Sequence, residues 1–174
     1  MKKMMIAPGL ALMTVLACAG PGQPATAAAQ EKGEVRWTVE ANAGKAGVPK
    51  LRLSHAKSSS DLSLDDALAV KRPEFDGARA VLGGTGPVRF SVAHESGTLD
   101  CTGTLTRAFA GRGKCSFAPD AGFEQALAAR GLAPEKRDDL FAMLIVDATI
   151  ELADGLAAEG VKPKDANDLI AAGA

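Results

Sequence analysis

Cys101 and Cys115 are the two residues whose type and spacing most directly predict a chemical bond. The segment 98–106 alternates apolar or small residues with polar ones, the period of a β-strand, and the same alternation returns after residues 107–111. A turn centred on Ala108 places Cys101 directly opposite Cys115 in an antiparallel pair. Directly opposed residues have Cβ atoms about 4.5–5.5 Å apart, close to what a disulfide needs. The sequence therefore predicts a hairpin closed by a Cys101–Cys115 disulfide.

The run His94-Glu95-Ser96 holds residue types that nucleophilic catalysis uses. Adjacent residues on a strand point to opposite faces, so we expect no relay among these three and interpret the run as a polar turn between two strands. His55 and His94 are the two histidines of the chain, and with a carboxylate they fall short of the usual zinc ligand spacing. Neither cysteine belongs to a Cys-x-x-Cys motif, which argues against a redox or metal role.

Two further motifs have ordinary structural explanations. Gly83-Gly84-Thr85-Gly86 lacks the Lys-Ser/Thr of a phosphate loop and precedes a predicted strand. Asp138, Asp139 and Asp168 resemble a carboxylate site, but acidic residues in a first helical turn offset the helix dipole. We therefore predict no catalytic, metal-binding or cofactor-binding residue and no cofactor. A dispersed Ser/His/Asp site, for instance around His55 and Ser96, stays open as an alternative.

The first thirty residues are typical of an export signal. Lys2-Lys3 precede a short apolar stretch, Met4 to Cys18, and small residues follow to Ala29. Cleavage within this small-residue end predicts a signal peptide of residues 1–29. Alternatively Val15-Leu16-Ala17-Cys18 resembles the lipobox of bacterial lipoproteins, so that 1–17 is removed, Cys18 is lipidated, and the residues after it form a flexible tether. Both routes predict a periplasmic or otherwise extracytoplasmic protein, anchored to the membrane in the second case.

Composition limits the partners of the exported part. The chain has 20 basic and 21 acidic side chains, and loss of Lys2 and Lys3 with the signal makes the net charge about −3, without bulk attraction for nucleic acid. One Trp and no Tyr disfavour a stacking surface for bases. No stretch after the signal is apolar for long enough to predict a membrane span.

The same export bears on the cysteines, since a cysteine pair in an oxidising compartment is expected to form a disulfide.

Residues 30–118 are predicted to be rich in strands. Ala41 to Pro49 is expected to be a loop and 58–61 an exposed polar segment, whereas Ser63 fits the N-cap of a short helix through Leu68, ending before Pro73. In the hairpin, Leu99 falls opposite Phe117. The alternating residues that indicate the other strands are Val35, Trp37 and Val39, then Leu51 and Leu53, then Val88, Phe90 and Val92.

Residues 119–174 are predicted to be helical and to repeat. A shift of 29 residues superposes eight identities, which predicts two short helix-turn-helix units. Asp120 and Thr149 suit N-caps, Gly131 and Gly160 suit left-handed helix ends, and Pro134 and Pro163 suit the first position of the next helix. The identities are Leu127/Leu156, Ala128/Ala157, Ala129/Ala158, Gly131/Gly160, Pro134/Pro163, Asp139/Asp168, Leu140/Leu169 and Ala142/Ala171.

Several segments together resemble a bacterial exported family of the cell envelope. They are Ser59 to Asp65, Gly86 to Phe90, Ser96 to Gly103 and Gly113 to Asp120, followed by the helical repeats. Similar segments occur as extracytoplasmic extensions of membrane metallopeptidases related to β-lactam sensors. The resemblance implies a β-rich part with a hairpin, then helical repeats, and a sensing or protein-contact role. It carries over no catalytic residue, because His-Glu-x-x-His is absent: Ser96-Gly97-Thr98 follows His94-Glu95.

We conclude from the sequence that the fold is α+β, with an antiparallel β portion holding a disulfide-bridged hairpin beside two helical repeats. The predicted function is a cell-envelope protein-interaction or sensing module without catalytic activity, whose partner is another envelope protein. The alternatives are a small periplasmic hydrolase and a lipid-anchored structural protein of the envelope.

Overall fold

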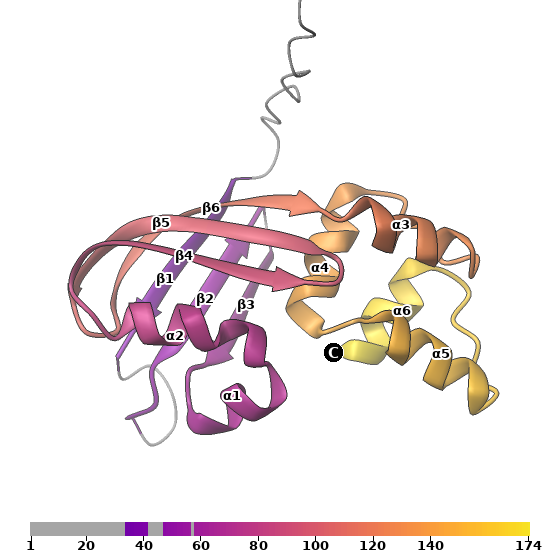
Figure 1. Ribbon diagram of the computed structural model, residues 1–174, viewed down its shortest axis with the longest axis horizontal. Coiled ribbons are helices and arrows are strands. Elements are labelled where there is room, and N and C mark those ends of the chain that lie inside the picture. Colours follow the sequence, from indigo (N-terminus) through magenta and orange to yellow (C-terminus); the bar gives the residue numbers. More distant parts are fainter. Residues whose placement is uncertain (1–33, 42–46, 57) are drawn as a thin grey trace, which may run out of the picture. The chain divides into compact units, whose positions relative to one another are not determined.

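A six-stranded antiparallel sheet forms the larger part of the fold, with helices against it, so the protein is α+β (Figure 1). The computed structural model describes residues 34–41, 47–56 and 58–174. The predicted signal segment 1–29, with Cys18, and most of the predicted loop 41–49 lie outside the described residues. The strands are β1 (Val35–Glu40), β2 (Lys50–His55), β3 (Ser58–Ser63), β4 (Gly86–His94), β5 (Gly97–Arg107) and β6 (Ala110–Pro119).

The strand order is β3-β2-β1-β6-β5-β4, so two three-stranded meanders meet where β1 pairs with β6. Because β3 and β4 are the opposite edges, the chain between them must cross one face of the sheet. It does so through α1 (Asp66–Lys71), the 3₁₀ turn η2 (Pro73–Phe75) and α2 (Asp76–Leu82). Leu64, Phe75, Ala78 and Leu82 of this crossing segment are buried in the same core as the sheet. The alternating apolar residues of the strands face this layer, and the polar residues between them lie on the other face.

Four helices follow the sheet: α3 (Ala121–Ala128), α4 (Arg137–Val146), α5 (Ile150–Ala158) and α6 (Ala166–Gly173). Phe141 and Leu144 of α4 belong to the sheet's core, and the ring of Phe141 packs edge-on against Phe117 of β6, with centroids 5.7 Å apart. A second apolar cluster joins α3, α4, α5 and α6 to one another. Among the described residues, none of the helices is both long and apolar enough to cross a membrane.

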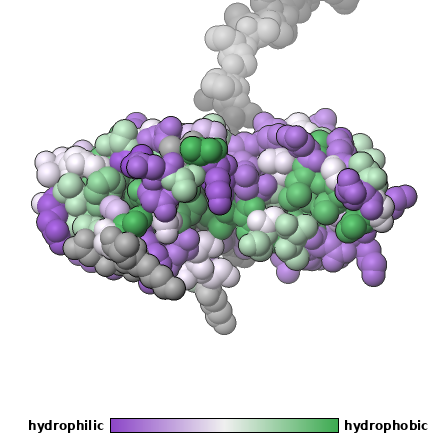
Figure 2. Space-filling view, turned by 90° about the horizontal axis from the view of Figure 1, so that it is seen from below, coloured by the Kyte–Doolittle hydropathy of each residue, from purple (hydrophilic) through white to green (hydrophobic). Residues whose placement is uncertain are grey.

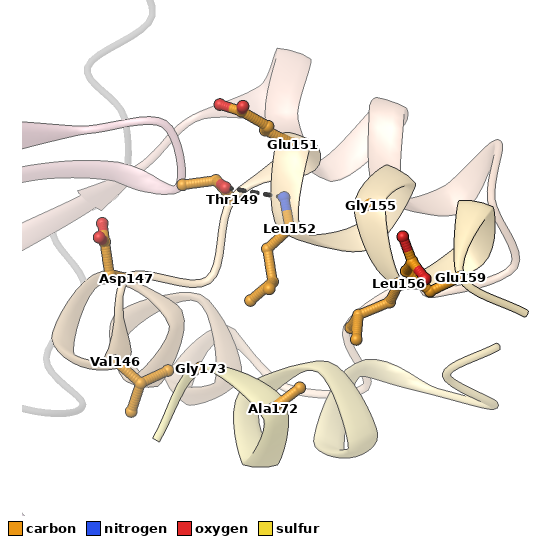
Figure 3. Close-up of a pocket in the computed structure, with 10 residues that line it drawn as sticks. All are labelled: Val146, Asp147, Thr149, Glu151, Leu152, Gly155, Leu156, Glu159, Ala172 and Gly173. Carbon is orange, nitrogen blue, oxygen red and sulfur yellow. Dashed lines mark hydrogen bonds between the residues drawn. The ribbon is translucent and has the colours of Figure 1, made fainter. Parts of the chain in front are cut away.

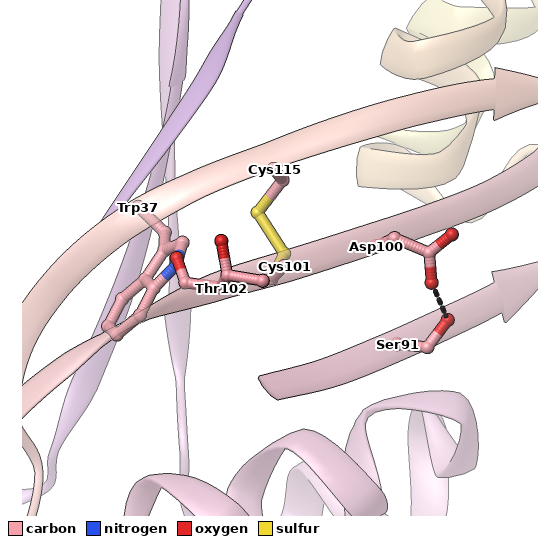
Figure 4. The surroundings of a disulfide bond; sticks show 6 residues. All are labelled: Trp37, Ser91, Asp100, Cys101, Thr102 and Cys115. Atoms are coloured by element: carbon pink, nitrogen blue, oxygen red, sulfur yellow. Dashed lines mark hydrogen bonds between the residues drawn. A yellow bond between two sulfur atoms is a disulfide. The ribbon is translucent and has the colours of Figure 1, made fainter. Parts of the chain in front are cut away.

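The predicted hairpin is confirmed residue by residue. Cys101 of β5 lies opposite Cys115 of β6, their Cα atoms are 4.0 Å apart, and a disulfide joins them (Figure 4). Leu99 lies opposite Phe117, as expected. Both cysteines are buried on the helix-covered face. The bond therefore links the two strands inside the core.

The β-portion departs from expectation at β3 and α1. Residues 58–61 are largely exposed, as expected, but they also form most of β3, which pairs with β2 along its whole length, and Leu62 enters the core. Helix α1 is capped by Asp65, whose carboxylate accepts the N–H of Leu68 at 3.0 Å, and Ser63 still belongs to β3. Ser63 is paired with Lys50 in the sheet, so the next acceptor along the chain takes the cap position.

The helix caps are confirmed in part. Asp120 accepts the N–H of Phe123 and Thr149 that of Leu152, and Gly131 and Gly160 have φ of 74° and 80°. The prolines are not at first helical positions, since the next helices begin at Arg137 and Ala166.

The late helix starts have a local cause. Asp139 accepts the N–H groups of Glu135 and Lys136, and Asp168 accepts that of Lys164. These carboxylates hold the residues before the helix in a non-helical turn. The interpretation of Asp139 and Asp168 as helix-terminus residues therefore has a direct hydrogen-bonding basis.

Candidate functional site

The turn between β4 and β5 holds the residue types suited to nucleophilic chemistry. His94 ends β4, Glu95 and Ser96 form the turn, and Gly97 begins β5, so the predicted turn is confirmed. The expectation of no relay within the turn was wrong for one pair: Ser96 Oγ lies 2.9 Å from His94 Nδ1. Residues two apart share a strand face, and the reversal of the chain at Ser96 brings its hydroxyl back to the imidazole.

Asp147 lies on the other side of the His94 ring from Ser96, so the three side chains form a Ser–His–Asp row. Its Oδ1 lies 3.3 Å from His94 Nε2, and the backbone N–H of Ser96 donates to His94 Nδ1 at 3.1 Å. Since Nδ1 accepts that N–H, a neutral imidazole carries its proton on Nε2 and donates it to Asp147. Asp147 follows α4 with φ of 59°, the left-handed conformation of a helix end. Fifty-three residues separate it from His94, so local sequence gives no signal for the pair.

Arg72 ties the same aspartate to the crossing segment. Its guanidinium donates to the backbone oxygens of Leu144 at 2.6 Å and Ile145 at 3.0 Å, and Nε lies 3.4 Å from Asp147 Oδ1. It also pairs with Glu74 at 2.5 Å. The cation thus satisfies carbonyl groups that the end of α4 leaves without helical partners. We call Arg72, Glu74, His94, Ser96 and Asp147 the polar network.

Burial decides what the polar network can do. Ser96 is 0% exposed and the His94 side chain 4%, whereas the Asp147 side chain is 42% exposed. A nucleophilic serine must reach the carbonyl carbon of a substrate, and a fully buried hydroxyl has no path to one. In this conformation the network joins β4–β5, the crossing segment and the end of α4.

Further bonds from the turn reach two helix starts. The backbone oxygen of Ser96 accepts the N–H of Asp120, which precedes α3, at 3.1 Å. The carboxylate of Glu95 accepts the N–H of Ile150, the first residue of α5, at 2.9 Å. Both N–H groups belong to helix termini that lack intrahelical acceptors. The turn therefore fastens α3 and α5 to the sheet.

His55 lies in different surroundings from His94. Its Nε2 is 3.9 Å from Asp138 Oδ1, and its ring packs against Phe141 with centroids 5.4 Å apart. Ser96, suggested as a partner for His55 in the dispersed site, bonds to His94. In the described ranges, no three His, Cys, Asp or Glu side chains are grouped closely enough to hold a metal ion.

A groove of about 650 Å³ lies between α5 and α6, beside the end of α4 (Figure 3). We call it the α5–α6 groove. Its apolar lining comes from Val146, Leu152, Leu156 and Ala172, and Leu152 and Leu156 point from α5 towards α6 (Figure 3). In the view of Figure 2, hydrophobic residues (green) lie among hydrophilic residues (purple), so some apolar side chains of the protein reach its surface on this face.

Three carboxylates border the α5–α6 groove: those of Asp147, Glu151 and Glu159. No lysine or arginine of the described residues lines it. Asp147 and Glu159 lie at opposite ends (Figure 3). The groove thus combines an apolar lining with an acidic border, and the sequence offered no signal for it beyond the predicted helices.

An ion pair fixes α5 relative to α3. Arg130, which follows α3, binds both carboxylate oxygens of Asp154 at 2.7 Å. This hydrogen bonding holds the pKa of Asp154 below its usual range. Asp154 is not among the residues that line the groove, so its charge is neutralised away from the lining.

No family model, curated protein or solved structure matches this chain.

Proposed function

We propose that this chain is an extracytoplasmic protein-binding module without catalytic activity, in which the sheet is the scaffold and helices α5 and α6 supply the contact surface. The observation that carries the proposal is the α5–α6 groove, an open apolar surface bordered by carboxylates. Its lining leucines, Leu152 and Leu156, are half-buried, so a partner gains by covering them. The buried hydroxyl of Ser96 supports the non-catalytic part of the proposal.

The proposed compartment is the periplasm or another extracytoplasmic space. The Cys101–Cys115 disulfide supports it, because structural disulfides persist in oxidising compartments. Export by the segment 1–29, or lipid anchoring at Cys18 after removal of 1–17, belongs to the same proposal. So does membership of the envelope family that the segments around Ser59 to Asp65 and Ser96 to Gly103 resemble.

We further propose that α3–α4 and α5–α6 are two copies of one helical unit. Equivalent hydrogen bonds recur 29 residues apart: Asp120 and Thr149 cap α3 and α5, and the N–H groups of Leu132 and Val161 bond to the backbone oxygens of Leu127 and Leu156, both at 2.9 Å. Stacked helical units commonly supply extended contact surfaces, which supports a binding role.

A site-specific photo-crosslinker tests the binding role. We expect benzoylphenylalanine at Leu156, inside the groove, to give a defined crosslinked adduct when the full chain is expressed with its signal and illuminated in cells. The same group at Thr104, on the polar face of β5, is the control and should give none. Adducts of equal yield from both positions, or none from Leu156, would contradict the proposal.

One observation favours a second candidate, a small serine hydrolase: the Ser96–His94–Asp147 hydrogen bonds. The two functions differ in whether Ser96 reacts. We expect a fluorophosphonate probe to leave the folded protein unlabelled, because the hydroxyl is buried. Ser96→Ala should lower the free energy of unfolding by roughly 1 kcal/mol through loss of one hydrogen bond. Stoichiometric labelling that Ser96→Ala abolishes would establish the hydrolase instead.

A further inference from the structure

The α5–α6 groove exists where the second helical unit has smaller side chains than the first. In the proposed 29-residue repeat, Met143 corresponds to Ala172 and Leu144 to Gly173. Met143 and Leu144 are fully buried in the apolar clusters, whereas Ala172 is exposed and lines the groove. Met143 packs in the apolar cluster of the four helices and Leu144 in the core of the sheet, whereas their counterparts Ala172 and Gly173 line the groove.

The apolar stripe of α5 is correspondingly less covered than that of α3. Phe123 and Leu127 of α3 are buried, whereas their equivalents Leu152 and Leu156 are only half-buried. The exposed fraction differs more for the equivalent residues that follow α3 and α5: Leu132 is 4% exposed, whereas Val161 is 56% exposed. The second unit therefore exposes apolar surface at positions whose counterparts in the first unit are buried.

The carboxylates at the border of the groove favour a positively charged occupant. Helix α5 has no basic residue in its last turn, and Glu159 lies where the helix dipole is already negative. Asp147 at the other end is partly balanced by Arg72, but Glu151 and Glu159 have no salt-bridge partner among the described residues. An anionic segment would meet repulsion at the border.

A two-fold contact of the groove with the same groove of a second copy is disfavoured. A two-fold contact through this groove would place Glu151 and Glu159 against the same residues of the partner, with no cation of the lining between them. Like charges facing each other across an interface oppose association. The occupant must bring its own positive charges.

We infer that the α5–α6 groove binds a basic peptide segment of another protein, which inserts leucine- or methionine-sized side chains between Leu152, Leu156 and Ala172 and pairs its cations with Glu151 and Glu159. The inference rests on the proposed binding function and gives the chemical class of the partner.

The test uses a labelled model peptide, Lys-Lys-Leu-Leu-Lys-Lys-Leu-Leu-Lys-Lys, and the mature chain in fluorescence anisotropy. Ala172→Met gives the second unit the residue of the first and should weaken binding about tenfold by filling the groove. Ala171→Met, on the same helix but outside the lining, is the matched control and should bind as wild type. Unfolding midpoints confirm that both variants fold.

Charge is tested with the same assay. Glu151→Gln with Glu159→Gln should weaken binding about fivefold, and raising NaCl from about 50 to about 500 mM should weaken it further. A peptide with every Lys changed to Glu, and one with every Leu changed to Ser, should bind much more weakly. Glu40→Gln, on β1 and outside the groove, is the charge control.

Two results would overturn the inference: no binding of the basic peptide at millimolar concentration, or equal binding by wild type and Ala172→Met. The crosslinking at Leu156 separates this failure from failure of the binding function. If Leu156 still gives its adduct in cells while the basic peptide does not bind, the module contacts a partner of different chemistry. If both fail, the proposed function fails with the inference.

Discussion

Replacing Trp37 by alanine is expected to lower the free energy of unfolding by about 3–5 kcal/mol, the usual cost of removing a buried aromatic side chain. Trp37 is 0% exposed, packs edge-on against Phe90 with centroids 5.5 Å apart, and donates its indole N–H to the backbone oxygen of Thr102 at 3.1 Å. The indole lies against Gly103 of β5 and Gly113 of β6, which face each other in the sheet. A Cβ on either glycine would come within 2.5 Å of the indole. The two glycines thus leave the space that this ring fills.

Urea unfolding monitored by circular dichroism measures the effect, because Trp37 is the single tryptophan and its fluorescence is lost with it. Trp37→Phe keeps an aromatic ring and should cost less than the alanine variant, so the series stays measurable if Trp37→Ala does not fold. Arg36→Ala, one residue away on the polar face of β1, is the control and should change stability by under about 0.5 kcal/mol. A loss below about 1 kcal/mol for Trp37→Ala would show that the indole is not central to the core.

Removing the disulfide is expected to lower the free energy of unfolding by about 3 kcal/mol, because the bond closes a short loop and restricts the unfolded chain. Cys101→Ala with Cys115→Ala should therefore unfold roughly 10 °C below wild type. The two residues are 14 apart and buried in the sheet's core. Thermal unfolding with and without dithiothreitol measures the change.

The reductant supplies the control. Wild type that is unfolded in dithiothreitol and then refolded in its presence should resemble the double variant. The double variant itself should not respond to the reductant. An identical unfolding midpoint for oxidised wild type and the double variant would mean that the bond contributes nothing to stability.

Features that depend on neighbours in the chain were predicted well. The Cys101–Cys115 register follows from one turn position and a period of two, so a single hairpin determines it. The caps of α3 and α5 follow from an acceptor three residues before the N–H that it binds. The pairing of β3 was missed because residues 58–61 are polar, and only the neighbouring strand β2 makes their backbone part of the sheet.

The candidate sites depended on contacts between distant parts of the chain. His94 and Ser96 were singled out as residue types, but Asp147 reaches His94 only because α4 ends beside the β4–β5 turn. The α5–α6 groove required the packing of α6 against α4 and α5, which the spacing of Leu152, Leu156 and Ala172 does not reveal. The local sequence pattern does not predict such contacts, because the burial of a residue depends on which distant parts of the chain pack against it.

The amino-acid sequence by itself determined the α+β class, the strand alternation, the register of the disulfide hairpin and several helix ends, because each is a matter of short-range periodicity and local hydrogen bonding. The tertiary structure alone decided that Ser96 is inaccessible, that the β4–β5 turn fastens α3 and α5 to the sheet, and that Ala172 borders an open groove. These three depend on the shape and charge of surfaces assembled from segments far apart in the chain.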